Sequence, residues 1–260
     1  MMDDKNIRVG ISSLIFNINE ALEICNKNKE INHIEIGIDN LCDCKELKKY
    51  ENDIKKLDLS VGIHLPMELN PCEDIIFIKE KWIEYINILS KELEFLNVTY
   101  FNMHLGYVMT NRLSKNKEMY LNNIVDFFNK LLLEKNHLHI TIENTYTKGG
   151  DFSNLGNDVE DFKYIFEHNK TISFCFDSGH NLICKSNYNL LKNKTRVIHL
   201  NDNYGIEDEH LGILKGNLSE EELKNILSLN PEFLVLEMNL IHIEESLDIL
   251  KEHNVFKNKK

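Results

Sequence analysis

The sequence predicts an α/β fold and, within that class, a closed (β/α)8 barrel of parallel strands surrounded by helices. Eight short apolar or β-branched runs alternate with longer amphipathic segments from one end of the chain to the other. The length of 260 residues suits an α/β barrel. No linker rich in proline, glycine or serine and no shift of composition divides the chain. We therefore expect one barrel domain over residues 1–260.

The predicted strands are short runs rich in isoleucine, valine, phenylalanine and threonine, which suit the pleated, buried surface of a sheet. In chain order they cover residues 7–13, 33–38, 60–64, 98–104, 137–143, 171–177, 195–201 and 233–237. Proline residues at 66 and 71 predict a loop after the third strand, and Gly149 and Gly150 predict a turn after the fifth.

The predicted helices have apolar residues at steps of three and four, which gives each helix one buried face. They cover residues 18–29, 74–96, 117–135, 159–169, 219–229 and 242–253. Ser219 followed by Glu222 forms a capping box at the start of one of them. Strands that alternate with helices run parallel, and eight such units close a barrel.

Composition and charge narrow the classes of function. The chain is 42% hydrophobic and 28% charged, and no apolar run approaches the length of a membrane span. The acidic start MMDDKNIRVG does not resemble a signal peptide, so we expect a cytoplasmic protein with its six cysteines reduced. The net charge of −12 and the presence of only three arginines disfavour broad binding to nucleic acid.

The strand ends carry the candidate site. In an α/β barrel the chemistry gathers where the strands end, at their carboxyl termini. Six of the eight runs carry a potential metal ligand at or within two residues of their end: His64, His104, Glu143, Asp177, His199 and Glu237. Imidazoles and carboxylates that converge on one barrel mouth would repel one another or stay unsatisfied unless a cation neutralised them.

Three further candidates follow the strand ends closely. His180 lies three residues after Asp177, and Asp208 and His210 lie in the loop after the seventh strand. Asp202, in the same loop, either orients an imidazole or caps the loop. Imidazole and carboxylate ligands without thiolate suit Zn²⁺, Mn²⁺, Fe²⁺ or Co²⁺ better than Ca²⁺ or Mg²⁺, although Mn²⁺ and Mg²⁺ both accept carboxylate-rich sites.

The ordered set of motifs resembles a known superfamily. His64, His104, Glu143 in TIENT, Asp177 and His180 in FDSGH, His199 in IHLND, Asp208 and His210 in DEH, and Glu237 in VLEM are similar to those of xylose isomerase-like TIM barrels. This superfamily includes sugar and sugar-phosphate isomerases and epimerases, and also the endonuclease IV type of abasic-site endonuclease, or AP endonuclease family 2. The resemblance covers nearly the whole chain.

The two branches imply different roles for the same residues. The endonuclease branch implies three zinc ions: the first on His64, His104 and Glu143, the second on Glu143, Asp177, His199 and Glu237, and the third on His180, Asp208 and His210. The epimerase branch implies one Mn²⁺-like ion on Glu143, Asp177, His199 and Glu237. In that branch Glu143 and Glu237 exchange a proton with the substrate carbon and His180 touches the substrate.

Departures from both branches guide the choice between them. The segment 202–216 has no arginine, whereas ketose epimerases commonly carry one there to hold sugar oxygens. Strand one runs into SSLIFNINE without the His-containing, Gly-rich segment of the endonucleases. The predicted loops 39–46 and 65–74 are acidic, which works against contacts with DNA phosphates. Lys215 is either a contact for a small substrate or a solvated loop residue.

The leading hypothesis is a divalent-metal-dependent isomerase or epimerase acting on a small sugar or sugar phosphate. The alternative is a zinc phosphodiesterase resembling endonuclease IV, and only this alternative has nucleic acid as a partner. A third hypothesis is a barrel that binds metal without catalysis. No membrane partner is expected, and the sequence does not predict the oligomeric state.

Overall fold

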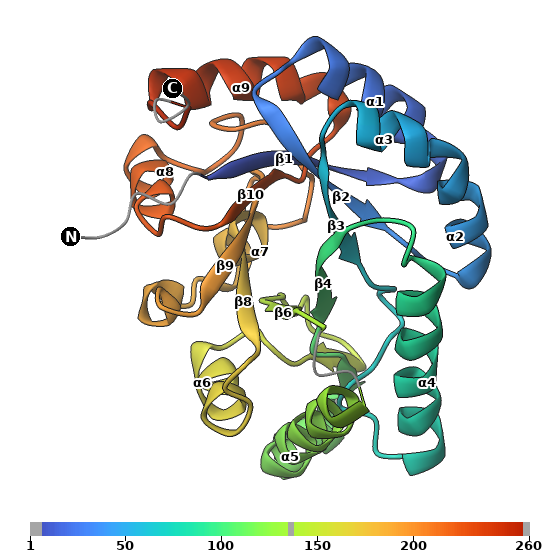
Figure 1. Ribbon diagram of the computed structural model, residues 1–260. Helices are drawn as coiled ribbons and strands as arrows, with labels where there is room; N and C mark the ends of the chain where they lie inside the picture. The colour runs from blue at the N-terminus through green and yellow to red at the C-terminus, as the bar shows by residue number, and fades with distance from the viewer. Residues whose placement is uncertain (1–6, 135–137, 257–260) are drawn as a thin grey trace.

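The predicted barrel is present in the structure, a computed structural model that describes residues 7–134 and 138–256 (Figure 1). Eight parallel strands close in the order β1-β10-β9-β8-β6-β4-β3-β2, with β1 pairing to β2. They are β1 (Arg8–Leu14), β2 (Ile31–Gly37), β3 (Ser60–His64), β4 (Val98–His104), β6 (Ile140–Glu143), β8 (Ser173–Asp177), β9 (Thr195–Leu200) and β10 (Phe233–Leu236). The α/β class and the (β/α)8 fold predicted from the sequence are confirmed.

The predicted domain of 1–260 extends beyond the described residues at both ends, and the predicted run 137–143 starts outside them. The single domain stays a prediction. It is supported by the pairing of β1 with β10, because these strands lie near opposite ends of the sequence.

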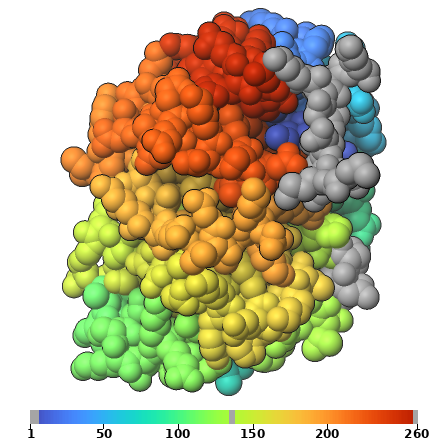
Figure 2. All heavy atoms as spheres, turned by 90° about the vertical axis from the view of Figure 1, so that its left-hand side faces the viewer, coloured from blue at the N-terminus to red at the C-terminus, as the bar shows by residue number. Residues whose placement is uncertain are grey.

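Helices surround the barrel, and each of the six predicted helices has a counterpart (Figure 1). The α-helices are α1 (Ile18–Lys27), α2 (Leu41–Leu47), α3 (Glu51–Lys56), α4 (Ile76–Glu92), α5 (Thr110–Glu134, interrupted at Asn116), α6 (Val159–His168), α7 (Ser178–Cys184), α8 (Glu220–Leu227) and α9 (Ile243–Glu252). Short 3-10 turns are η1 (Ile15–Asn17), η2 (Lys48–Tyr50), η3 (Tyr188–Leu191) and η4 (Leu240–His242). Figure 2 shows the face on which α6, η3 and α8, coloured yellow to orange, lie one above the other.

Three helices differ from the prediction. The segment 39–46, expected to be an acidic loop, contains most of α2, and α3 follows it. Asn40 and Asp43 form a capping box that starts α2, and the buried Leu47 packs it on the barrel. Helix α7 also lies outside the predicted helices and begins directly after β8, where the Asp177 side chain accepts a hydrogen bond from the backbone N–H of His180.

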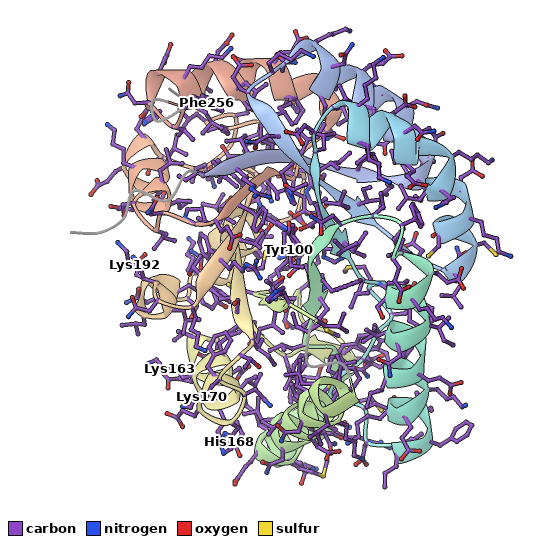
Figure 3. The ribbon with its side chains drawn as sticks, in the orientation of Figure 1. Tyr100, Lys163, His168, Lys170, Lys192 and Phe256 are labelled. Atoms are coloured by element: carbon purple, nitrogen blue, oxygen red, sulfur yellow. The ribbon has the colours of Figure 1, made fainter. Side chains whose placement is uncertain are left out.

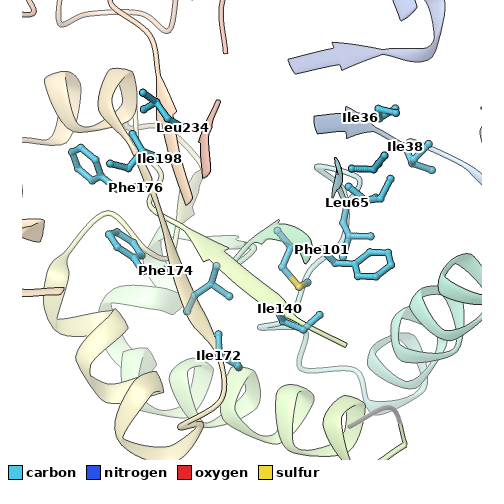
Figure 4. Close-up of a cluster of buried hydrophobic side chains, with 14 of the residues drawn as sticks. Ile36, Ile38, Leu65, Phe101, Ile140, Ile172, Phe174, Phe176, Ile198 and Leu234 are labelled. Carbon is cyan, nitrogen blue, oxygen red and sulfur yellow. The ribbon is translucent and has the colours of Figure 1, made fainter. Parts of the chain in front are cut away.

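The main hydrophobic core lies between the barrel and the helices. Figure 4 shows side chains of this layer, including Ile36, Phe174, Ile198 and Leu234, carried by four different barrel strands. All four are buried, with 5% or less of their surface exposed. Side chains alternate along a strand, so the other half of the strand residues point into the barrel interior. The interior residues decide what the barrel mouth can hold.

A small second sheet borders the mouth. Strands β5 (Tyr107–Met109) and β7 (Phe152–Asn154) pair in antiparallel fashion and join the loop after β4 to the loop after β6. The rings of Tyr107 and Phe152 meet edge to face, with centroids 5.8 Å apart. This sheet gives one side of the mouth a fixed wall.

Within residues 7–134 and 138–256, no helix has the length and apolar character needed to cross a membrane. The six cysteines are all free.

Candidate metal centre

The six predicted strand-end residues lie together at the barrel mouth. His64, His104, Glu143 and Asp177 are the last residues of β3, β4, β6 and β8. His199 is the last residue but one of β9, and Glu237 directly follows β10. The register places neighbours side by side, because His104 pairs with Glu143 and Asp177 pairs with His199.

Glu143 connects two groups of these side chains. Glu143, Asp177, His199 and Glu237 each offer a ligand atom, and these atoms all lie within 4.8 Å of one another. The same holds for His64, His104 and Glu143. His199 Nδ1 lies 2.7 Å from Glu237 Oε2 and 3.2 Å from Glu143 Oε2. His64 Nε2 and His104 Nε2 lie 3.4 and 3.3 Å from the two carboxylate oxygens of Glu143.

These close contacts are not aligned as hydrogen bonds. His104 Nε2, both ring nitrogens of His199 and Glu237 Oε2 are buried polar atoms for which the structure shows no hydrogen-bond partner among the described residues. Buried polar groups without partners are costly, so an arrangement that leaves several of them facing one another calls for another group. Imidazole and carboxylate donors at these separations fit a divalent cation.

The electrostatics agree with an excess of negative charge. Burial alone would lower the pKa of His199, but Cys175 and the nearby carboxylates outweigh it and raise the pKa well above its usual range. Burial would raise the pKa of Glu237, but the His199 charge lowers it to about 2. Burial, together with neighbouring carboxylates, raises the pKa of Asp177 to about 7. Without a cation, protons on the imidazoles balance the carboxylates.

The remaining three predicted ligands form a looser group. Asp208 Oδ2 lies 3.1 Å from His180 Nε2 and 3.2 Å from His210 Nε2. Among the described residues, the clusters in which all ligand atoms lie within 4.8 Å of one another include none of these three side chains. His210 adopts a left-handed backbone conformation with φ of 50°, and its Nδ1 lies 2.8 Å from the Glu237 carbonyl oxygen. A strained backbone at a histidine indicates that the surrounding structure holds it there.

The structure decides between the two roles considered for Asp202. Its carboxylate accepts hydrogen bonds from the backbone N–H groups of Asn203, Gly216 and Leu218, at 2.7, 2.7 and 2.9 Å. Asp202 therefore organises the loop after β9.

Lys215 lies apart from the predicted ligands at the barrel mouth. It forms an ion pair with Glu245 on α9, and it is not among the described residues that line the two cavities at the mouth. The structure thus gives no support to a role in substrate binding.

Sequence reasoning missed three residues that touch the predicted ligands. Glu35 Oε1 lies 2.9 Å from His199 Nε2, and the Asn102 amide donates a hydrogen bond to Glu143. Cys175 can offer its sulfur within 4.8 Å of ligand atoms of Glu143 and His199, although no thiol was expected at the site. Burial raises the pKa of Cys175 well above its usual range, which keeps it protonated. The alternation of His33, Glu35 and Gly37 with isoleucines in HIEIGI is the pattern that could have revealed Glu35.

Two cavities meet at the mouth. The mouth cavity, of about 390 Å³, is lined by five carboxylates and four histidines but, among the described residues, by no lysine or arginine. A side pocket of about 470 Å³ lies against the small sheet, with Tyr107, Tyr146 and Phe152 in its walls. Lys148 also lines it, with Nζ 3.6 Å from Glu207. The two cavities share His104, His180 and Asp208 among others, so one ligand can reach both.

Comparison with known sequences gives distant relatives. No family model matches the chain. A protein of Methanocaldococcus jannaschii, described only as uncharacterised, is 25% identical over 95% of this chain and 99% of its own length. A probable endonuclease 4 of Thermosipho melanesiensis is 29% identical over 58% of this chain, and the chain spans 59% of that protein.

Comparison with solved structures shows the fold. A D-tagatose 3-epimerase-like protein has a TM-score of 0.80 at 22% identity, covering 97% of this chain and 99% of its own. Endonuclease IV from Thermus thermophilus has a TM-score of 0.66 at 16% identity, with coverage of 94% and 99%. Another protein of that organism, crystallised and soaked with ZnCl2, has a TM-score of 0.70 at 16% identity, with coverage of 95% and 97%. The chain therefore has the barrel fold of these solved structures, which include proteins named for a sugar epimerase and for endonuclease IV.

Proposed function

We propose that the chain is a divalent-metal-dependent isomerase or epimerase that acts on a neutral sugar or small polyol. The lining of the mouth cavity carries this proposal, because it combines carboxylates and imidazoles with no lysine or arginine among the described residues. Phosphate groups are commonly held by lysine or arginine, which do not line this cavity among the described residues, whereas sugar hydroxyls suit a cation and carboxylate oxygens. The structure of highest TM-score quoted above is named for a sugar epimerase.

Glu143, Asp177, His199 and Glu237 would hold the cation, with Mn²⁺ or Zn²⁺ suited to these donors. When bound, the cation would polarise the carbonyl and adjacent hydroxyl of a sugar and so make the intervening C–H more acidic.

The two glutamates are placed to move the proton. Glu143 is the last residue of β6, and Glu237 directly follows β10. In the barrel, β8 and β9 lie between these two strands. The two carboxylates therefore reach the cavity from different sides. Burial alone would raise the pKa of both carboxyl groups, but the nearby charge of His199 lowers it in each case. Both glutamates are therefore ionised at neutral pH. One removes the proton from the substrate carbon, and the other, once protonated, returns a proton from the other face.

His180 is positioned beside this pair. Its Nδ1 lies 2.8 Å from the carbonyl oxygen of Asn144, and its Nε2 lies 3.1 Å from Asp208 and borders both cavities. An imidazole fixed at one nitrogen can donate to a sugar oxygen with the other. We therefore assign substrate contact to His180.

The test combines metal content with proton exchange. Metal-free protein is loaded separately with Mn²⁺, Zn²⁺, Co²⁺ and Mg²⁺ and incubated in D₂O with a panel of aldoses, ketoses and polyols. We expect NMR to show a product isomer that carries one solvent deuterium at the reacting carbon. Failure of every loaded form to exchange any carbon-bound hydrogen of any panel member would contradict the proposal.

A zinc phosphodiesterase is the second candidate, and the grouping of His180 and His210 around Asp208 favours it. The match to a probable endonuclease 4 supports it as well. Three tightly held zinc ions, together with nicking of a duplex that contains one abasic site, would establish this candidate in place of the first. One exchangeable ion and an intact duplex would exclude it.

A further inference from the structure

One buried carboxylate inside the barrel is not part of the predicted site. Glu35 lies in the middle of β2 and only 1% of its surface is exposed. An ionised carboxylate buried to this degree requires donors or a positive partner. Its partners come from β4 and β9, which do not neighbour β2, so the contacts cross the barrel interior.

Both oxygens of Glu35 have a close partner. Its Oε2 accepts a hydrogen bond from the Tyr100 hydroxyl at 2.6 Å. Its Oε1 lies 2.9 Å from His199 Nε2, an ion-pair contact that is not aligned as a hydrogen bond. His33 Nε2 lies 3.0 Å from the Tyr100 oxygen. Because Tyr100 gives its proton to Glu35, the His33 N–H donates to Tyr100. Burial, together with Arg8, lowers the pKa of His33 to about 3, so this ring is neutral and has one N–H to give.

Two glycines make room for this column of polar side chains, which we define as His33, Tyr100 and Glu35. Tyr100 pairs with Gly62 on β3, and His33 pairs with Gly10 on β1. A Cβ at Gly62 would lie 2.4 Å from Tyr100 Cζ, and one at Gly10 would lie 2.7 Å from His33 Cδ2. Figure 3 places Tyr100 near the middle of the barrel. Glycine within a strand weakens it, so its presence beneath both rings indicates that the column needs this space.

The column ends at His199, a predicted ligand, and contacts the ring nitrogen that faces away from Glu143 and Glu237. His199 turns Nδ1 toward Glu237 and Glu143 and turns Nε2 toward Glu35. A carboxylate that faces one ring nitrogen keeps a proton there and directs the lone pair of the other nitrogen outward. The imidazole itself is completely buried, and Glu35 is the carboxylate within ion-pair distance of Nε2.

We propose that Glu35, held by Tyr100 and His33, is a positioning residue that orients His199 so that Nδ1 faces the cation. This inference rests on the metal-dependent function proposed above. It assigns a role to side chains inside the barrel that are not among the predicted ligands. The column begins at His33 near the amino end of β2 and reaches the mouth at His199, so it links the lower barrel to the site.

The test measures affinity for the metal alone. Metal-free protein is titrated with Co²⁺, whose visible absorption reports its ligand geometry, and Zn²⁺ affinity follows by competition with a chelator. Glu35→Gln keeps the size and an oxygen for Tyr100 but removes the negative charge behind His199. We expect its affinity to fall by about 10- to 100-fold, with an altered Co²⁺ spectrum. Tyr100→Phe and Gly62→Ala, which disturb the column without touching His199, should reduce affinity in the same direction by a smaller factor.

Asp161→Asn is the matched control. Asp161 is also a buried carboxylate, with 1% of its surface exposed, but it pairs with Lys117 near α6. Its substitution should lower the melting temperature of the metal-free protein and leave metal affinity unchanged. Equal affinity losses in Glu35→Gln and Asp161→Asn would reduce the effect to general destabilisation and overturn the inference.

The outcomes separate the inference from the function on which it rests. Absence of Co²⁺ binding by the unmodified protein would refute the metal-dependent function itself. Binding by the unmodified protein, with Glu35→Gln within about twofold of it, would refute only the positioning role. If Glu35→Gln does not fold, the metal affinity of Tyr100→Phe is compared with that of the unmodified protein in its place.

Discussion

The mouth of the barrel holds two sets of candidate residues that differ in what supports them. The strand-borne set lies at strand ends fixed by the ladder of the closed sheet: His64, His104, Glu143, Asp177, His199 and Glu237. The loop-borne set, His180, Asp208 and His210, lies on α7 and in the loop after β9. Four members of the first set, Glu143, Asp177, His199 and Glu237, would hold an ion in both branches that the chain resembles, whereas the second set would add a separate site. Under the proposed function, the strand ends would carry the cation site and the loops would adapt the reaction.

The largest expected effect comes from the strand-borne set. Glu237→Gln retains the shape of the side chain but removes the proton acceptor, so turnover should fall by about 10²- to 10⁴-fold. Circular dichroism and the melting temperature should change little. The matched substitution Glu209→Gln, in the loop after β9, should retain turnover. Full activity in Glu237→Gln would refute the role of the paired glutamates.

The support of the loop-borne set can be removed separately. Asp202→Ala leaves three backbone N–H groups, two of them fully buried, without their acceptor, which should lower the free energy of unfolding by roughly 2–4 kcal/mol. The loop that carries Asp208 and His210 should loosen, while one cation still binds at the strand-borne set. Chemical denaturation and metal analysis measure the two effects. Asp151→Ala, an exposed carboxylate in another loop, serves as the control. Complete loss of metal would mean that the two sets are not independent.

A direct substitution in the loop-borne set should have a smaller effect on the reaction. Under the proposed function, His210→Ala should reduce turnover by less than about tenfold, because His210 contacts the Asp208 carboxylate and the backbone carbonyl of Glu237 but neither of the two proton-transfer carboxylates. Mass spectrometric metal analysis should still find one ion. Loss of activity as severe as that of Glu237→Gln would favour the zinc phosphodiesterase.

The smallest effect concerns the metal-free protein and pH. Burial opposes protonation of His64 and His210, but Glu143 and Asp208 outweigh it and raise their pKa values to about 9 and about 10. Folded values above the unfolded value of about 6.5 give stability that is complete below pH 6.5 and is lost as the pH rises through 9 and 10. The melting temperature in chelator should therefore fall by a few degrees from pH 6.5 to 10.

The two sets can be distinguished in the same measurement. His64→Gln should remove the part of the decrease centred near pH 9, and His210→Gln the part near pH 10. Bound metal should flatten the curve, since it occupies nitrogens that would otherwise hold protons. A melting temperature that rises with pH over this window would show that the histidines are not stabilised as cations.

The sequence was sufficient for the barrel and for the strand-borne set. Apolar runs stop where the chain leaves the barrel, so His64, His104, Glu143 and Asp177 stand at the ends of both the runs and the strands. The structure brings these side chains together at the mouth, and the role of each as a ligand stays a prediction. The same holds for the choice of isomerase over endonuclease.

Features that depend on contacts distant in sequence were missed. Glu35 lies in the middle of a strand, and its proposed role depends on its contact with His199, which is 164 residues away in the sequence. Strands β5 and β7 have three residues each and exist only because they pair. Helix α2 has only seven residues, and its buried side chains, Cys44 and Leu47, stabilise it against the barrel.

The glycines beneath the interior column constrain how the sequence can change over evolution. Gly62 and Tyr100 are cross-strand partners, as are Gly10 and His33. A larger residue at 62 is compatible only with a smaller one at 100, and a smaller residue at 100 without a larger one at 62 leaves a void beside Glu35. Among chains that share this barrel, positions 62 and 100 are therefore expected to vary as a pair, and so are positions 10 and 33.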